Sequence, residues 1–229
     1  MNHEAAVLAT RIWTSLAAAI LCLAASPVET VRDRVVAEAR TLSPATLAFE
    51  RTITVTQADA KDKASQTRVD RWDGKTWTLV SLDGKPASAD DRAKHAKAAT
   101  AGAVPGYYRL ATMLAASTAT TDAQGRTMLR AATLPPKSVF TSGKDVTQNF
   151  GAEAIVAGGA RPYVQQLRLT ARAPFRMMMV AKIESFVTVS DYARDANGTP
   201  RLIRQVADIR GSMMGKGGNQ HVETNFTYR

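Results

Sequence analysis

Residues that could act as nucleophiles, bases or metal ligands are few in this chain and lie in unrelated segments. Beyond the N-terminal stretch the histidines are His95 and His221, which fall in different predicted elements. They therefore cannot form the His-x-x-x-His pair that holds zinc on one helix face. The chain contains no Gly-x-Ser-x-Gly sequence, so Ser-His-Asp chemistry has no nucleophile to start from. We expect no catalytic residue, no metal and no cofactor, and a protein that is not an enzyme.

A glycine-rich segment from Gly211 to Gly217 superficially resembles a phosphate-binding loop. It has three residues between its first two glycines rather than four, and Gly217 follows Lys216 where a serine or threonine is needed. The segment also joins two predicted strands rather than a strand and a helix, so we predict a hairpin loop. Carboxylates are common elsewhere, but their spacing does not place two of them across a cleft as in a glycosidase.

The most prominent stretch of the chain is Phe175 to Tyr192. The apolar residues that share one parity in it are Phe175, Met177, Met179, Ala181, Ile183, Val187 and Val189. Side chains alternate across a strand, so this pattern predicts one long half-buried strand with an apolar inner face. Its methionines have two interpretations: they fill an ordinary core, or they adapt to an irregular apolar ligand. The residues predicted to line a ligand site are Phe49, Ile53, Phe175, Met177, Met179 and Ile183.

The first 25 residues have the character of a secretory signal peptide. Arg11 precedes an uncharged apolar run from Ile12 to Ala25, which has the length of a signal core and is short for a bilayer span. Cleavage after Ala24 or Ala25 would remove Cys22, the one cysteine of the chain, and with it disulfide and thiol chemistry. We expect a protein of the periplasm in a Gram-negative envelope. The alternative is an uncleaved membrane anchor.

The chain is strongly basic, with a formal net charge of +10 over 229 residues. The predicted signal peptide carries one acidic and one basic residue, so this charge stays with the predicted single domain from 26 to 229. A basic envelope protein meets anionic lipid headgroups, although a soluble surface that happens to be basic is the plainer interpretation. Basic residues are scattered along the strands, and export argues against nucleic acid as the partner. We expect no transmembrane segment after signal cleavage.

One turn and its flanking residues predict a specific hairpin register. Asp73-Gly74 lies between two β-rich runs, and a two-residue turn of this kind needs positive φ at both central positions. The resulting register places Asp70 opposite Trp77. It also places Trp72 and Trp77 on opposite faces of the hairpin, where each packs against the core or an edge.

The remaining patterns predict two helices and a meander of strands. Val28–Leu42 has helical spacing of apolar residues, and Ser88-Ala-Asp-Asp91 is a capping box for a helix ending near Ala99. Tyr107–Ala116 is ambiguous in its periodicity, and its neighbours favour a strand. From Phe150 onward the connections are of hairpin length, so the strands are expected to pair antiparallel.

The order of these features resembles the LolA/LolB-like superfamily of envelope lipoprotein carriers. It runs from a signal peptide and short helix, through strands containing W-D-G-K-T-W and a capped helix, to long antiparallel strands. It is also similar to a group of uncharacterised exported proteobacterial proteins. The resemblance implies a mainly β (α+β) fold: a strongly curved antiparallel sheet or incomplete β-barrel, with a few short helices packed on or in it. It implies acyl chains in the hollow and, in some carriers, a gating arginine, for which Arg51 on its apolar strand face is the candidate polar anchor.

Two functions fit these observations. The first is a periplasmic binding or carrier protein for a lipid or other hydrophobic ligand, with apolar walls and a few polar anchors. The alternative is a non-enzymatic envelope module with a solid core, which acts through surface contacts with an envelope protein partner or a polymer.

Overall fold

The computed structural model describes residues 27–59, 63–99, 104–141, 143–177, 181–213 and 216–229. The predicted signal peptide lies outside these residues. The helices are α1 (Pro27–Arg40), α2 (Ala89–Ala99) and α3 (Leu110–Met113). The strands are β1 (Phe49–Ala58), β2 (Lys63–Trp72), β3 (Trp77–Leu82), β4 (Lys85–Pro86), β5 (Thr118–Thr121), β6 (Thr127–Ala131), β7 (Phe140–Thr141), β8 (Lys144–Asp145), β9 (Phe150–Ala157), β10 (Tyr163–Ala171), β11 (Phe175–Met177), β12 (Ala181–Arg194), β13 (Pro200–Met213) and β14 (Lys216–Tyr228).

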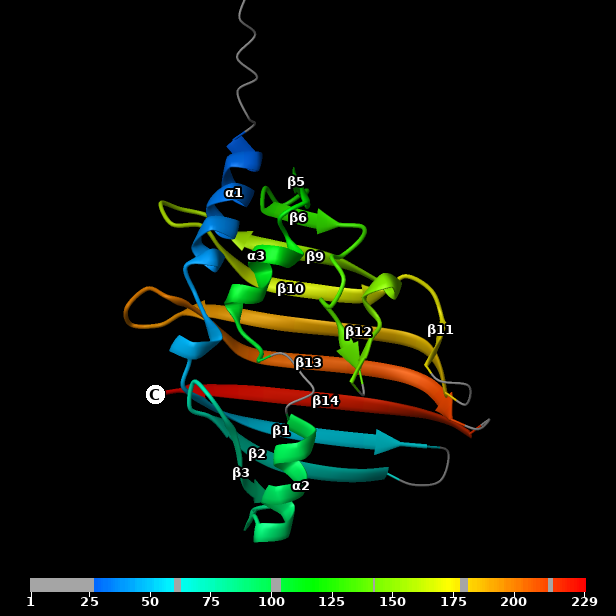
Figure 1. Ribbon diagram of the computed structural model, residues 1–229. Coiled ribbons are helices and arrows are strands. Elements are labelled where there is room, and N and C mark those ends of the chain that lie inside the picture. The colour runs from blue at the N-terminus through cyan, green and yellow to red at the C-terminus, as the bar shows by residue number, and fades with distance from the viewer. Residues whose placement is uncertain (1–26, 60–62, 100–103, 142, 178–180, 214–215) are drawn as a thin grey trace, which may run out of the picture.

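One large antiparallel sheet contains nearly all the strands. Its order is β4-β3-β2-β1-β14-β13-β12-β10-β9-β6-β5, with β11 paired to β12, while β7 and β8 form a separate hairpin. The sheet is strongly curved and its edges β4 and β5 do not meet, so it is not closed into a barrel (Figure 1). This confirms the predicted fold class, a curved and mainly antiparallel β structure with a few short helices.

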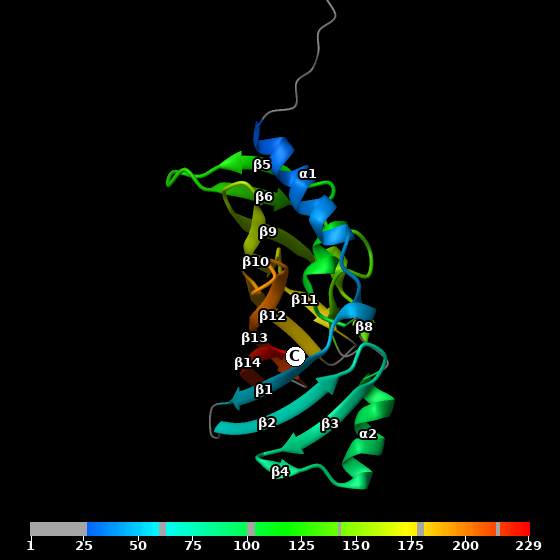
Figure 2. The same ribbon diagram turned by 90° about the vertical axis from the view of Figure 1, so that its left-hand side faces the viewer.

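The helices lie on the concave side of the sheet (Figure 2). The apolar spacing of α1 buries Val35, Val36 and Ala39, which pack with Leu110 of α3 in one continuous core. The predicted helix over Val28–Leu42 is therefore confirmed, with its ends shifted by one or two residues. The capping box that begins α2 is also confirmed. The backbone N–H of Asp91 donates to Ser88 Oγ at 3.1 Å, and the backbone N–H of Ser88 donates to the Asp91 carboxylate at 3.2 Å.

The prediction of one long strand from Phe175 to Tyr192 is wrong. The segment is a hairpin, in which β11 pairs with the start of β12 so that Phe175 lies opposite Ile183 and Met177 opposite Ala181. A β-bulge between Ile183 and Ser185 further breaks the alternation. The parity pattern missed the reversal because residues paired across a hairpin share a face, so both arms keep their apolar side chains on one side.

The predicted two-residue turn at Asp73-Gly74 is also wrong in its register. Trp72 pairs directly with Trp77, and Asp70 lies opposite Leu79. The turn is longer because the Asp73 carboxylate accepts hydrogen bonds from the backbone N–H groups of Lys75 and Thr76, at 2.8 and 2.7 Å. Such side-chain bonding replaces the tight turn with a wider loop. The two tryptophans therefore lie on the same face, with ring centroids 5.3 Å apart.

The segment Tyr107–Ala116 is helical rather than a strand. A 3-10 turn over Tyr107–Arg109 leads into α3, and the buried side chains recur at Tyr107, Leu110, Met113 and Leu114. This is the spacing of one helix face, which the flanking turn residues obscured. The predicted meander after Phe150 is confirmed, and its glycine-rich hairpin is tighter than expected because Gly211 pairs with Gly218. A Cβ at Gly211 would lie 2.3 Å from the Lys182 carbonyl oxygen, so the close approach of β12 needs glycine there.

Three tyrosines in this fold should resist ionisation until the protein unfolds. Burial raises the pKa of Tyr107 and Tyr192 well above the ordinary value, and raises the pKa of Tyr228 to about 12. The unfolded chain releases these protons near about pH 10 while the folded chain retains them. Stability is therefore fully present below about pH 10 and falls as the pH rises above it.

The test is an alkaline titration that follows phenolate absorbance and far-ultraviolet circular dichroism on the same sample. We expect the absorbance of these three side chains to appear only together with the loss of the β signal. Complete ionisation of all five tyrosines of the chain in a protein with native dichroism would contradict their burial.

Candidate ligand-binding face

A group of half-buried apolar side chains lies side by side on the concave face of the sheet. Strand register places Val55 opposite Val222, Val222 opposite Ala207, and Phe175 opposite Ile183. Each of them keeps part of its surface exposed, unlike the fully covered residues under α1 and α3. We call this set the apolar strip, and its members are Val55, Phe175, Ile183, Ala207, Ile209 and Val222.

Next to the apolar strip, the concave face is closed by a solid aromatic cluster. Phe49 is completely buried, and its ring centroid lies 5.5 Å from those of Trp77, Phe226 and Tyr228. Edge-on packing of this kind contributes more than burial alone. Trp72 completes the cluster, and its indole N–H donates to the Pro44 carbonyl at 3.0 Å. In this structure Phe49 supports the wall of the face and does not reach solvent.

Arg51, the candidate polar anchor, is held on this face by a buried carboxylate. Its Nε and Nη2 both donate to Oδ2 of Asp70, at 3.2 and 2.9 Å, and its guanidinium lies 3.9 Å from the ring centroid of Trp77. Burial lowers the pKa of Arg51, while the charge and hydrogen bonds of Asp70 act in the opposite direction. Arg51 therefore carries a charge that Asp70 already neutralises.

The second oxygen of Asp70 makes a polar contact with two further residues. Oδ1 lies 3.2 Å from Nε of Arg68 and 3.1 Å from Nε2 of His95, which α2 brings down onto β2. These distances suit ion pairs, yet Asp70 Oδ1, Arg68 Nε and His95 Nδ1 are buried and make no well-aligned hydrogen bond to any described residue. We call Arg51, Arg68, Asp70 and His95 the charged cluster. It ties β1, β2 and α2 together on the same concave face as the apolar strip.

Sequence reasoning placed Arg51 on this face but missed Asp70 and His95. The sequence pattern assigns His95 to a predicted helix without a partner, whereas its side chain is buried against Asp70. The predicted hairpin register concerned only β2 and β3, so it did not indicate the partner of Asp70 on β1. The useful signal was Arg51 itself, because a guanidinium on a buried face needs a counter-charge, and Asp70 pairs directly with it in the β1–β2 register.

The other predicted lining residues are divided between the apolar strip and the core. Phe175 and Ile183 belong to the strip, and Met177 is half-buried at the end of β11. Ile53 is buried beside the charged cluster, with 8% of its surface exposed. Met179 lies outside the described residues. The structure therefore brings only part of the predicted set to an accessible surface.

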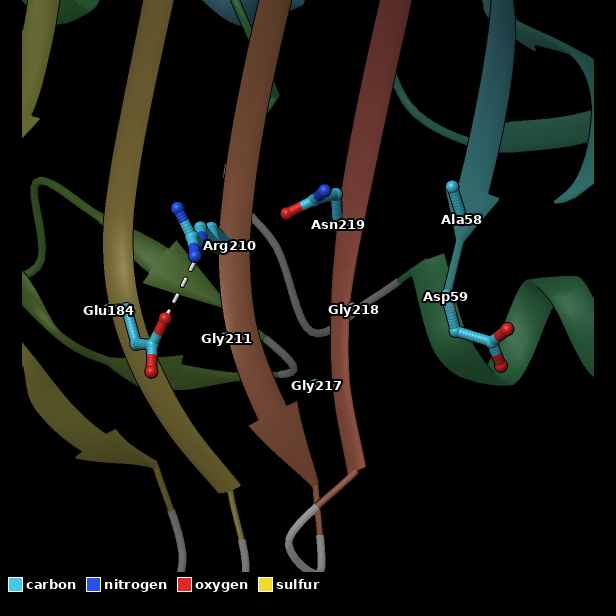
Figure 3. Close-up of a pocket in the computed structure, with 8 residues that line it drawn as sticks. All are labelled: Ala58, Asp59, Glu184, Arg210, Gly211, Gly217, Gly218 and Asn219. Carbon is cyan, nitrogen blue, oxygen red and sulfur yellow. Dashed lines mark ion pairs between the residues drawn. The ribbon is translucent and has the colours of Figure 1, made fainter. Parts of the chain in front are cut away.

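A polar hollow lies outside the predicted set, where the ends of β1, β12, β13 and β14 meet (Figure 3). Its volume is about 580 Å³, and its lining residues are Ala58, Asp59, Glu184, Arg210, Gly211, Gly217, Gly218 and Asn219. Three glycines leave the sheet backbone bare, and Arg210 pairs with Glu184 across it at 3.4 Å. Three charged side chains and one amide line it, so this hollow offers little continuous surface to an apolar ligand.

Within the described part of the chain, none of the helices is both long and apolar enough to cross a bilayer. Among the same residues, no three histidine, cysteine, aspartate or glutamate side chains converge in a way that could hold a metal ion.

Comparison with known proteins gives weak likenesses only. No protein-family model matches the chain, and no curated protein sequence matches it. Among solved structures, a DUF1329 family protein from Desulfovibrio piger is similar at a TM-score of 0.33, and a LolA superfamily protein from Nitrosomonas europaea at 0.26. Each is 10% identical, and each alignment covers 88% of this chain and 93% of the other. The second structure belongs to the superfamily that the sequence pattern resembles.

Proposed function

We propose that this protein is a non-enzymatic carrier that holds a lipid or another hydrophobic ligand against the apolar strip. The observation that carries the proposal is the strip itself, a continuous half-buried apolar surface on the concave side of an open sheet. Surface of this kind gains roughly 25 cal/mol for each Å² that a ligand removes from water. Covering about 200 Å² of it would thus contribute on the order of 5 kcal/mol.

Export is part of the proposal. The apolar N-terminal stretch and the absence of cysteine after Cys22 suit a protein that works in the periplasm of a Gram-negative envelope. A carrier in that compartment would move an apolar molecule through an aqueous layer, shielding it on the concave face.

A solid interaction module is the second candidate, and two observations favour it. The aromatic cluster fills the concave face between β1, β3 and β14 without leaving accessible space. The hollow in Figure 3 and a second one of about 420 Å³ beside α1 both have charged residues in their walls. On this reading the strip would be covered by another protein rather than by a small ligand.

Native mass spectrometry with organic extraction, on protein purified without detergent, separates the two candidates. The carrier predicts an adduct that extracts as lipid. The matched variants are Ile209→Gln in the strip and Ile203→Gln at an exposed site on the same strand, where 42% of the residue surface is accessible. We expect the adduct to fall about tenfold in the first variant, from lost apolar contact and an added polar group, and to persist in the second.

A bare polypeptide mass in the unmodified protein, with no uptake of a fluorescent fatty acid, would reject the carrier and favour the interaction module. Equal adduct levels in the Ile209 and Ile203 variants would place the ligand somewhere other than the strip. Thermal unfolding of each variant shows whether its fold is intact.

A further inference from the structure

Exposed cations gather at one end of the sheet, where β11 and β12 form their hairpin and β13 leads into β14. Arg176 lies opposite Lys182 in the β11–β12 register, and Lys216 lies opposite Met213 at the end of β13. Arg210 lies two residues before Ser212, the β13 partner of Lys182, beside the hollow in Figure 3. Lys63 is on the same row as Arg210, because Lys63 pairs with Ala58, Ala58 with Asn219 and Asn219 with Arg210. We call these residues the basic tip: Lys63, Arg176, Lys182, Arg210 and Lys216.

The carboxylates at this end do not balance the cations. Glu184 is shared by Lys182, at 3.9 Å, and Arg210, at 3.4 Å, and Asp59 at the end of β1 is the second acidic residue. Among the described residues at this end of the sheet, five cations against two carboxylates leave a surplus of three positive charges. Within the described residues, no carboxylate pairs with Arg176 or Lys216. Other basic residues of the sheet, such as Arg130 and Arg204, do have acidic partners.

The basic tip adjoins the apolar strip. Phe175 precedes Arg176 and Ile183 follows Lys182, so the two apolar residues form the next row of the hairpin. Because side chains alternate along a strand, Phe175 and Ile183 point to the face opposite the two cations. The end of the sheet is therefore amphipathic, with charged heads on one face and half-buried apolar groups on the other. Long basic side chains beside apolar surface suit the headgroup region of a bilayer, where the stems stay apolar and the charges meet phosphates.

We propose that the basic tip docks the protein onto an anionic lipid bilayer. Charge complementarity selects this partner, since each lysine or arginine near an anionic membrane surface strengthens binding about fivefold. The apolar groups beside the cations favour a bilayer over a nucleic acid, which offers no hydrocarbon layer to receive them. The inference goes beyond the carrier function and stands apart from it, because docking needs the tip whereas cargo binding needs the strip.

Co-sedimentation of the full-length chain with vesicles tests the proposal. One set of vesicles mixes phosphatidylglycerol with phosphatidylcholine, and the other contains phosphatidylcholine alone. The tip variant is Arg176→Gln/Lys182→Gln. The matched control is Arg40→Gln/Lys75→Gln, which also removes one exposed arginine and one exposed lysine. Arg40 ends α1 and Lys75 lies in the β2–β3 turn, both away from the basic tip. The apolar N-terminal stretch is common to all the chains, so differences between them report the tip.

We expect binding to the anionic vesicles that weakens with added salt, and about 30-fold weaker binding of the tip variant. The control variant should bind like the unmodified chain. Equal binding of the tip and control variants, or equal binding to both kinds of vesicle, would overturn the proposal. Tighter binding of the unmodified chain to double-stranded DNA than to anionic vesicles would also overturn it. Lipid extraction in the experiment above tests cargo alone, so failure of the carrier function and failure of docking are distinguishable.

Discussion

Replacing Asp70 with alanine should lower the free energy of unfolding by about 3–5 kcal/mol. Asp70 is completely buried, and its two oxygens contact Arg51, Arg68 and His95. Removing the carboxylate leaves the Arg51 guanidinium largely buried without its counter-charge. Breaking one side of a buried ion pair costs far more than the pair contributes relative to apolar residues, because the remaining charge is poorly solvated.

Urea unfolding of the variant and of a matched control measures this effect. The control is Glu153→Ala, which removes a carboxylate from an exposed ion pair with Arg130 at 2.9 Å, and we expect it to cost less than about 1 kcal/mol. If the two variants lose the same stability, the charged cluster is not buried as described.

A double variant, Arg51→Met/Asp70→Leu, extends this prediction to the ligand site. Removing both charges should recover part of the stability lost in Asp70→Ala, because apolar side chains of similar volume replace a desolvated ion pair at little cost. If Arg51 is a polar anchor for the ligand, this variant should also lose the lipid adduct while it remains folded. If the adduct persists, Arg51 holds the sheet together and does not contact the ligand.

Replacing Phe49 with alanine should cost about 3–5 kcal/mol, through lost burial and the cavity left behind. Phe49 stands at the centre of the aromatic cluster, and its ring contacts come from Trp77 of β3 and from Phe226 and Tyr228 near the end of β14. The neighbours are fixed in strands on both sides, so they cannot collapse into the space.

Thermal and urea unfolding check this prediction, with Phe140→Ala as the control. Phe140 is the exposed phenylalanine of β7, with 37% of its surface accessible, and its truncation should cost less than about 1 kcal/mol. We further expect Phe49→Ala protein that remains folded to keep its ligand, because the apolar strip is untouched. Loss of the ligand from folded Phe49→Ala protein would show that the ligand enters the aromatic cluster.

The two predictions distinguish residues that stabilise the concave face from residues that contact the ligand. Phe49 and Asp70, at the centres of the aromatic and charged clusters, are completely buried, so changes there are expected to act on stability. The apolar strip is half-buried, so changes there are expected to act on binding with little loss of fold. A carrier needs both a buried core and an open ligand face. The open face stays partly exposed and contributes less to folding, so the fully covered core must supply most of the stability.

Local pattern by itself determined a good part of this structure. The spacing of apolar residues gave α1, the Ser88–Asp91 capping box gave the start of α2, and short connections gave the antiparallel meander after Phe150. The parity of Phe49, Arg51 and Ile53 placed a cation on an apolar face. These features depend on residues close in sequence, whose geometry is set by helix and strand periods and by local hydrogen bonds.

Tertiary structure decided what periodicity could not. A side chain's parity is the same in one long strand and in a hairpin, so only pairing revealed that Phe175 and Ile183 lie opposite each other. The Asp73 carboxylate widened its turn, which placed Asp70 opposite Leu79 rather than Trp77, and the separate β1–β2 pairing placed Asp70 opposite Arg51. His95 became buried because α2 folds over β2 and β3, 25 residues beyond its partner Asp70. Long-range pairing therefore determines which of the predicted residues form the solid wall of the concave face and which remain open to a ligand.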